Sequence, residues 1–228
     1  MAEHRQEFER DLEAIEARII ELFAMVAEDL PEATKALLSG DNEILQRLME
    51  RNKVISGVYA ETEDLANREI LLQAPVADDL RFLLSVLRVL TEFELSHDLV
   101  VQIAARGNHF LNDELSPRSR GIIERMGGLV SDMWRQAADC WYQRDRSGAF
   151  ALADRDREMD QLYSSLIAEL ASGRMTIPVT MEMTLVARFY ERLGDHAVNI
   201  ARRVVYLAGT AGSAGPTEPT GPTGPTSS

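Results

Sequence analysis

Residues 188–202 read RFYERLGDHAVNIAR, and this stretch indicates how the whole chain is built. Apolar side chains in and around it recur at steps of three and four, which places them on one face of an α-helix. They are Val186, Tyr190, Leu193, Ala197, Ile200, Val204 and Leu207. On the same helix Glu191 and Asp195 are four positions apart, so their carboxylates lie one turn apart on one face.

The acidic pair has two interpretations. Like charges at this spacing destabilise a helix by about 0.2–0.5 kcal/mol, and a cation or a basic partner held between them would reverse the sign. Alternatively, the pair is a solvated acidic edge that Arg188 and Arg192 neutralise. Because acidic residues are mostly exposed, the pair by itself favours the second interpretation.

An altered copy of the stretch lies in the first half of the chain. Residues 91–104 read TEFELSHDLVVQIA. When they are aligned with residues 188–201, Glu94 corresponds to Glu191 and Asp98 to Asp195. Further pairs upstream share one constant spacing: Asp41 with Asp145, Asn52 with Asp156, Ser56 with Asp160, and Tyr59 with Tyr163. A repeat of roughly a hundred residues, with the corresponding residues in the same order, predicts two copies of one helical unit.

Apolar spacing and turn residues predict six long helices and no strand. The first three cover about residues 5–38, 42–72 and 76–106, and the last three begin near 117, after 148 and after 178. Asp41 and Ser116 are expected to cap helix starts, with Pro117 at a first helical position. We expect Pro31 to kink or split the first helix, and Gly127 with Gly128 to loosen the fourth.

The predicted fold class is therefore all-α, with two repeated three-helix bundles. The first repeat covers residues 1–107 and the second covers residues 108–208. Residues 209–228 are rich in Gly, Pro and Thr, cannot bury a core, and are expected to be disordered.

Composition limits the function. A net charge of −13 opposes binding to nucleic acid or to an anionic membrane surface. No apolar run reaches the roughly 18 residues that span a bilayer, and the charged start is not a signal peptide. The single cysteine, Cys140, fits a reducing cytosol and an inert buried thiol. We expect a cytoplasmic protein that is not inserted in a membrane.

Two strings resemble the PhoU family of bacterial phosphate-signalling regulators. They are LQAPVADDLR at residues 72–81 and ERLGDHAVNIA at residues 191–201, and the resemblance extends over about residues 5–207. It implies two three-helix repeats, each with two acidic motifs of the form E/D-x-x-x-D on different helices. In some members of the family these motifs bind metal, which implies metal here too.

In the second repeat, Asp156 falls in an apolar stripe with Asp160 one turn on. A buried carboxylate needs a cation, a basic partner or protonation. If the fifth and sixth helices pack antiparallel, Asp156, Asp160, Glu191 and Asp195 can converge. Carboxylates without thiolates suit hard cations, namely iron, magnesium, manganese or calcium. The alternative is that the nearby arginines neutralise them: Arg155, Arg157, Arg188 and Arg192.

The first repeat departs from this pattern. Asn52 and Ser56 stand where the second repeat has acids, and His97 stands where it has Gly194. The acids that remain are Glu94, Asp98 and Glu92. Because fewer carboxylates bind a divalent ion more weakly, we expect a site at Glu94 and Asp98 that is weak, empty or helped by His97.

An enzymatic alternative comes from Glu94 and His97, whose Glu-x-x-His spacing occurs in di-iron carboxylate bundles. That chemistry needs a second such motif, and Gly194 occupies the corresponding position. We therefore expect a protein that is not an enzyme. His196, beside Asp195, is interpreted as a packing or hydrogen-bonding residue.

The expected function comes from the resemblance. It implies a cytoplasmic adaptor between the ATPase subunit of a phosphate ABC transporter and a sensor histidine kinase, which represses the phosphate-starvation response when phosphate is plentiful. A homodimer is also expected. The alternatives are a helical adaptor without metal and a small metal-dependent oxidase.

Overall fold

The computed structural model describes residues 2–108 and 115–208, which are helical apart from short turns. The elements are α1 (Ala2–Ser39), α2 (Asn42–Gln73), α3 (Ala77–Ala105), a 3-10 turn η1 (Arg106–Asn108), α4 (Pro117–Gln143), α5 (Arg146–Leu170) and α6 (Ile177–Ala208). The predicted all-α fold of six long helices is confirmed. The predicted disorder of residues 209–228 lies outside the described residues.

The predicted helix starts are set by side-chain caps. Asp41 accepts hydrogen bonds from the backbone N–H groups two and three positions on, at 2.9 and 3.2 Å. Asp145, its counterpart in the second repeat, does the same at 2.8 and 3.1 Å. Ser116 caps α4 and Pro117 occupies its first turn, where a missing N–H loses no helical bond.

One expected helix distortion, a split of the first helix at Pro31, needs correction. α1 continues without a break through Pro31, so the proline does not split it. α4 likewise continues through Gly127 and Gly128. A Cβ atom at Gly127 would lie 2.3 Å from Thr34 Oγ1, so this glycine permits the close approach of α1 and α4.

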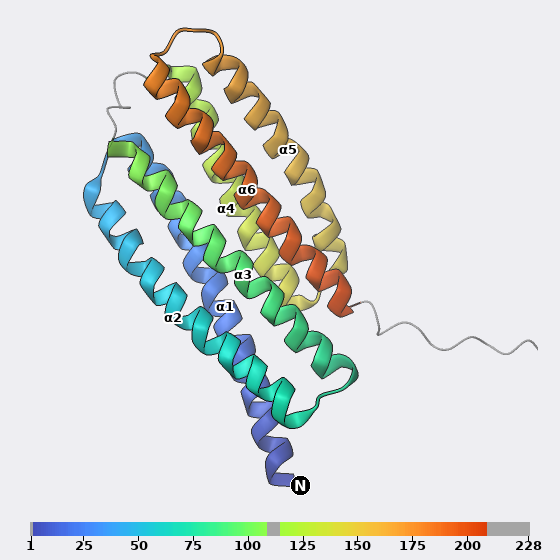
Figure 1. Ribbon diagram of the computed structural model, residues 1–228. Coiled ribbons are helices and arrows are strands. Elements are labelled where there is room, and N and C mark those ends of the chain that lie inside the picture. The colour runs from blue at the N-terminus through green and yellow to red at the C-terminus, as the bar shows by residue number, and fades with distance from the viewer. Residues whose placement is uncertain (1, 109–114, 209–228) are drawn as a thin grey trace, which may run out of the picture.

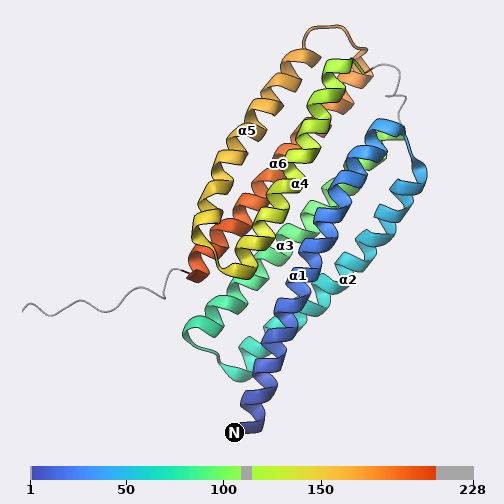
Figure 2. The same ribbon diagram turned by 180° about the vertical axis from the view of Figure 1, so that it is seen from behind.

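The two three-helix halves lie side by side along their length (Figures 1 and 2). Between them α1 contacts α4, and α3 contacts α6; this boundary is called the seam below. The α2–α3 turn and the α5–α6 turn lie at opposite ends of the molecule (Figure 1).

The hydrophobic core is continuous across the seam. The ring centroids of Phe23 and Phe93 are 4.7 Å apart, and those of Phe93 and Trp134 are 5.8 Å apart. Aromatic side chains from both repeats therefore pack against one another. Within the described residues no helix is long and apolar enough to cross a membrane.

Candidate functional site

The acidic residues of the second repeat lie on two neighbouring helices. Asp156 and Asp160 are on α5, and Glu191 and Asp195 are on α6, which packs against α5. Asp156 Oδ1 lies 3.7 Å from where a Cβ atom of Gly194 would stand. The Asp156 carboxylate therefore lies close to the α6 backbone at Gly194, at a distance at which a Cβ atom would make ordinary van der Waals contact.

These carboxylates influence one another electrostatically. Burial, followed by the charges of Asp195 and Asp160, raises the pKa of Asp156. Burial and the charge of Asp195 also raise the pKa of Glu191, against the opposing charge of Arg188. The four acids thus share one region of negative potential that a cation would relieve.

Among the described residues, Glu191 is the one acid of the four with an arginine ion pair. Its Oε2 atom is buried and accepts no well-aligned hydrogen bond, although an Arg188 guanidinium nitrogen lies 2.5 Å away. Of the other three arginines expected to neutralise the cluster, Arg155 pairs with Asp132 and Arg157 with Asp154, and Arg192 forms no ion pair with the four acids, all of which lie in the described ranges. Within the described part of the chain, an arginine ion pair is found for Glu191 alone of the four acids, although the charge of Arg202 also acts to lower the pKa of Asp156.

The cluster is not a closed metal cage in the conformation shown. In the part of the chain that the structure describes, no three His, Cys, Asp or Glu side chains come together as a metal-binding group. The oxygen donors match a hard cation in chemistry. The Asp160 and Asp195 side chains are exposed, so their present positions leave room for them to close on a cation.

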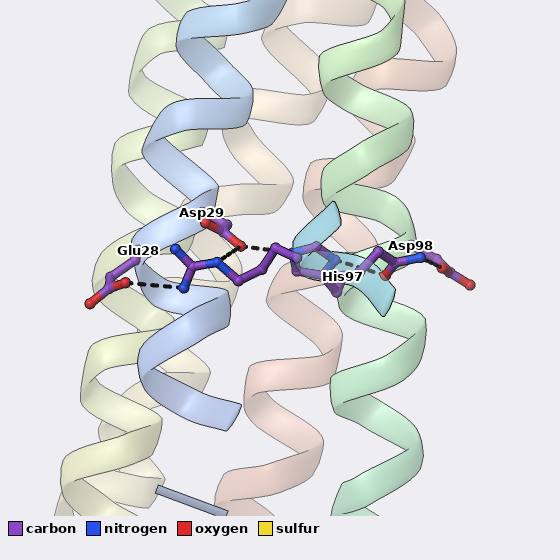
Figure 3. Close-up of polar contacts among 6 residues, drawn as sticks. Glu28, Asp29, His97 and Asp98 are labelled. Atoms are coloured by element: carbon purple, nitrogen blue, oxygen red, sulfur yellow. Dashed lines mark hydrogen bonds and ion pairs between the residues drawn. The ribbon is translucent and has the colours of Figure 1, made fainter. Parts of the chain in front are cut away.

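In the first repeat, hydrogen bonds replace the second acidic pair (Figure 3). Asn52 Nδ2 donates to Asp98 Oδ1 at 3.0 Å, which directs Asn52 Oδ1 toward His97 Nδ1 at 2.8 Å. His97 Nε2 lies 2.8 Å from Asp29 Oδ2 on α1. The His97 ring of α3 therefore joins Asn52 of α2 to Asp29 of α1 through its two nitrogens.

This network corrects the expectation that His97 helps a cation bind. The ring of His97 is fully buried and both of its nitrogens are engaged, so it cannot also be a metal ligand. Glu94 is half-buried one turn before Asp98, and Glu92 accepts a hydrogen bond from Asn199 across the seam. The same contacts disfavour the di-iron interpretation, because its histidine would have to leave one of these partners to bind iron.

Sequence analysis missed two members of the network. Asp29 is 4% exposed on α1, and Arg51 Nε lies 3.6 Å from its carboxylate. Arg51 also pairs with exposed Glu28 at 3.4 Å (Figure 3). Asp29 lies between Val26 and Ala33 on the apolar stripe of α1, and a charge on such a stripe signals a buried partner.

His196 forms a polar contact across the seam. Its Nδ1 atom lies 2.7 Å from Ser96 Oγ of α3, which confirms a hydrogen-bonding residue. Burial, assisted by the charge of Arg192, lowers its pKa to about 4, so the ring is neutral at neutral pH. Burial raises the pKa of Cys140 to about 11, as expected for an inert thiol.

The fold and site define a class of protein: a helical bundle made by duplication of a three-helix unit, with acidic helix pairs. A family model described as the PhoU domain matches residues 19–107 and again residues 123–204. The chain belongs to the PhoU family.

Curated relatives and solved structures agree with this assignment. A phosphate-specific transport system accessory protein PhoU homolog of Zymomonas mobilis is 32% identical over 207 residues, covering 89% of this chain and 86% of that protein. A PhoU homolog from Pseudomonas aeruginosa is 27% identical over 206 residues, and the match covers 89% of this chain and 85% of that protein. The crystal structure of PhoU from Pseudomonas aeruginosa superposes with a TM-score of 0.81 at 26% identity, covering 88% of this chain and 98% of that one.

Proposed function

We propose that this protein is a cytoplasmic, non-enzymatic regulator of phosphate uptake. In this role it links the ATPase subunit of a phosphate ABC transporter to a sensor histidine kinase, and restrains the kinase when phosphate is plentiful. The observation that carries the proposal is the match of both repeats to the PhoU domain. Relatives of nearly the same length, named as phosphate-specific transport system accessory proteins, support it.

The shape of the bundle suits an adaptor. Large apolar side chains are exposed at the α2–α3 turn, where Leu71 is 81% and Val76 is 74% exposed. Others are exposed at the start of α6, where Ile177 is 76% and Met181 is 64% exposed. Because these turns lie at opposite ends (Figure 1), a rigid bundle could contact two partners at once.

A pull-down from cells at high and low phosphate tests the adaptor role. We expect the transporter ATPase and the kinase to be retained by the wild-type protein at high phosphate. The matched variant Leu71→Glu with Val76→Glu alters only the exposed α2–α3 end and should lose one of the two partners. Retention of neither partner by the wild-type protein would contradict the proposal. We also propose that the protein is a homodimer, which sedimentation of the purified protein tests.

The proposal includes a hard metal ion between α5 and α6. Asp156, Asp160, Glu191 and Asp195 would hold it, and bound metal would screen their mutual repulsion. Support comes from the oxygen donors and from the raised pKa values of Asp156 and Glu191. Glu94 and Asp98 would bind such an ion weakly, since Asp98 is already hydrogen-bonded to Asn52.

Elemental analysis after exposure to iron, magnesium, manganese or calcium tests the metal site. Glu191→Ala with Asp195→Ala should abolish metal retention while circular dichroism shows unchanged helix content. The matched control, Glu94→Ala with Asp98→Ala in the first repeat, should retain most of the metal. Equal loss from both double variants would refute the asymmetry, and no metal in the wild-type protein would favour the metal-free adaptor.

A further inference from the structure

We propose that the seam between α3 and α6 holds a binding site for a phosphate group, formed around Arg88, Arg202 and Arg203. The site is separate from the acidic cluster, and it uses residues from both repeats. Arg88 lies on α3, whereas Arg202 and Arg203 lie in the last two turns of α6. Nothing in this site depends on the proposed role in phosphate transport.

Two cavities of about 240 and 150 Å³ lie along this part of the seam, and Arg88 and Arg203 line both of them. The larger cavity is also lined by Val89, Glu92, Asn199 and Arg202. The smaller one is also lined by Leu84, Ser85 and Tyr206. The two guanidinium groups therefore stand between two spaces that a small anion could enter.

The arginines are unusual in a chain with 37 acidic and 24 basic residues. Among the described residues, no carboxylate lies within 4 Å of a guanidinium nitrogen of Arg88, Arg202 or Arg203, and Arg202 donates only to Asn199 Oδ1 at 3.3 Å. Glu92 is the one carboxylate among the lining residues. The charges of Glu92 and Arg203 influence one another, but three arginines against one carboxylate leave the lining with an excess of positive charge.

A second observation points into the smaller cavity. Ser85 is 1% exposed, yet its hydroxyl has no hydrogen-bond partner among the described residues. Hydroxyls in helices often bond the carbonyl one turn earlier, as Thr62 and Thr184 do here. The buried Ser85 hydroxyl is instead left as a donor at the cavity wall beside two arginines, where an anionic oxygen would satisfy it.

At the other end of the seam, the residues that correspond to Arg203 and Ser85 form an ion pair that is absent here. The spacing of 97 positions that relates Glu94 to Glu191 also relates Ser85 to Glu182 and Arg106 to Arg203. Arg106 Nε lies 3.1 Å from Glu182 Oε2, and its guanidinium lies 4.6 Å from the centre of the Phe189 ring. Arg106 of the first repeat therefore has a carboxylate partner from the second repeat, whereas Arg203 of the second repeat shares a cavity with Ser85 of the first.

A phosphate group matches this set of donors. Guanidinium groups bind phosphate oxygens through paired N–H donors, and several arginines can contact separate oxygens of one tetrahedral anion. A dianion also balances the positive charge better than a single carboxylate would. The phosphate can be the free inorganic ion or the phosphate end of a nucleotide, and these two sources are distinguished by titration.

Isothermal titration calorimetry with inorganic phosphate tests the site. The buffer contains EDTA, so that phosphate cannot bind through a metal at the acidic cluster. We expect saturable binding that weakens at least tenfold in Arg88→Gln and in Arg203→Gln. Ser85→Glu introduces a carboxylate at the position that corresponds to Glu182, and it should abolish phosphate binding. Arg88 is exposed, so the Arg88→Gln variant remains informative if Ser85→Glu fails to fold.

Arg106→Gln is the matched control, because it removes the same charge at the related position and should leave phosphate binding unchanged. ATP binding more tightly than inorganic phosphate would assign the phosphate end of a nucleotide, and the reverse would assign the free ion. Absence of binding at millimolar phosphate would overturn the proposal. The proposal would also be overturned if Arg88→Gln, Arg203→Gln and Ser85→Glu bound phosphate as tightly as the wild type does. Citrate binding as tight as phosphate binding would overturn it too.

Discussion

Replacing Asp29 with alanine is the strongest test of the network in the first repeat. Asp29 is 4% exposed, and its Oδ2 atom lies 2.8 Å from Nε2 of fully buried His97 and 3.6 Å from Arg51 Nε. The Asp29→Ala variant removes the carboxylate and leaves the histidine in the same buried position. The remaining partner of the ring would then be Asn52.

The expected effect is large because only one member of a buried pair is removed. Such changes lower the free energy of unfolding by about 3–5 kcal/mol, since the remaining polar group keeps its desolvation penalty. For a chain of this size, 1 kcal/mol shifts the melting temperature by roughly 2–4 °C. We therefore expect the melting temperature to fall by roughly 10 °C.

Urea unfolding followed by circular dichroism measures the effect, with Glu28→Ala as the matched control. Glu28 is exposed and pairs with the same Arg51 at 3.4 Å, so its loss should change stability by less than about 1 kcal/mol. In a double-mutant cycle, Asp29→Ala should destabilise a His97→Leu protein far less than it destabilises the wild type. A loss of under about 1 kcal/mol for Asp29→Ala would refute the reasoning, because a buried pair broken on one side cannot be so mild.

Two further predictions concern packing and pH. A Cβ atom at Gly107 would lie 2.3 Å from the Ala36 carbonyl oxygen, so Gly107→Ala should lower the free energy of unfolding by about 1–3 kcal/mol. Gly57 has open space around it, so the control Gly57→Ala should not destabilise the protein. Burial raises the pKa of Glu69, which means that its ionised form destabilises the fold above that pKa. Glu69→Gln should therefore be more stable than the wild type at neutral pH. Thermal unfolding should show the difference in melting temperature between the two proteins shrinking as the pH falls, and a difference that stays constant would contradict this.

Local patterns accounted for most of the architecture. The helix starts at Asp41, Ser116 and Asp145 depend on side chains within three positions of the N–H groups that they cap, so they could be predicted from neighbouring residues. The spacing of Glu191 and Asp195 likewise places both on one helix face. The split at Pro31 was wrong because the packing of α1 on its neighbours outweighs the local propensity of proline, and only the structure shows that Gly127 makes room for Thr34.

The sequence by itself determined six helices, their duplication and the acidic pair on each repeat, because helical periodicity and capping act over a few residues. Only the tertiary structure decided that His97 faces Asp29, that Ser96 meets His196, and that Arg88 and Arg203 stand beside one cavity. A helical period shows which face of a helix is buried, but not which residue of a distant helix will meet it. The two repeats therefore have similar patterns and yet differ at the seam, where one arginine has a carboxylate partner and the other does not.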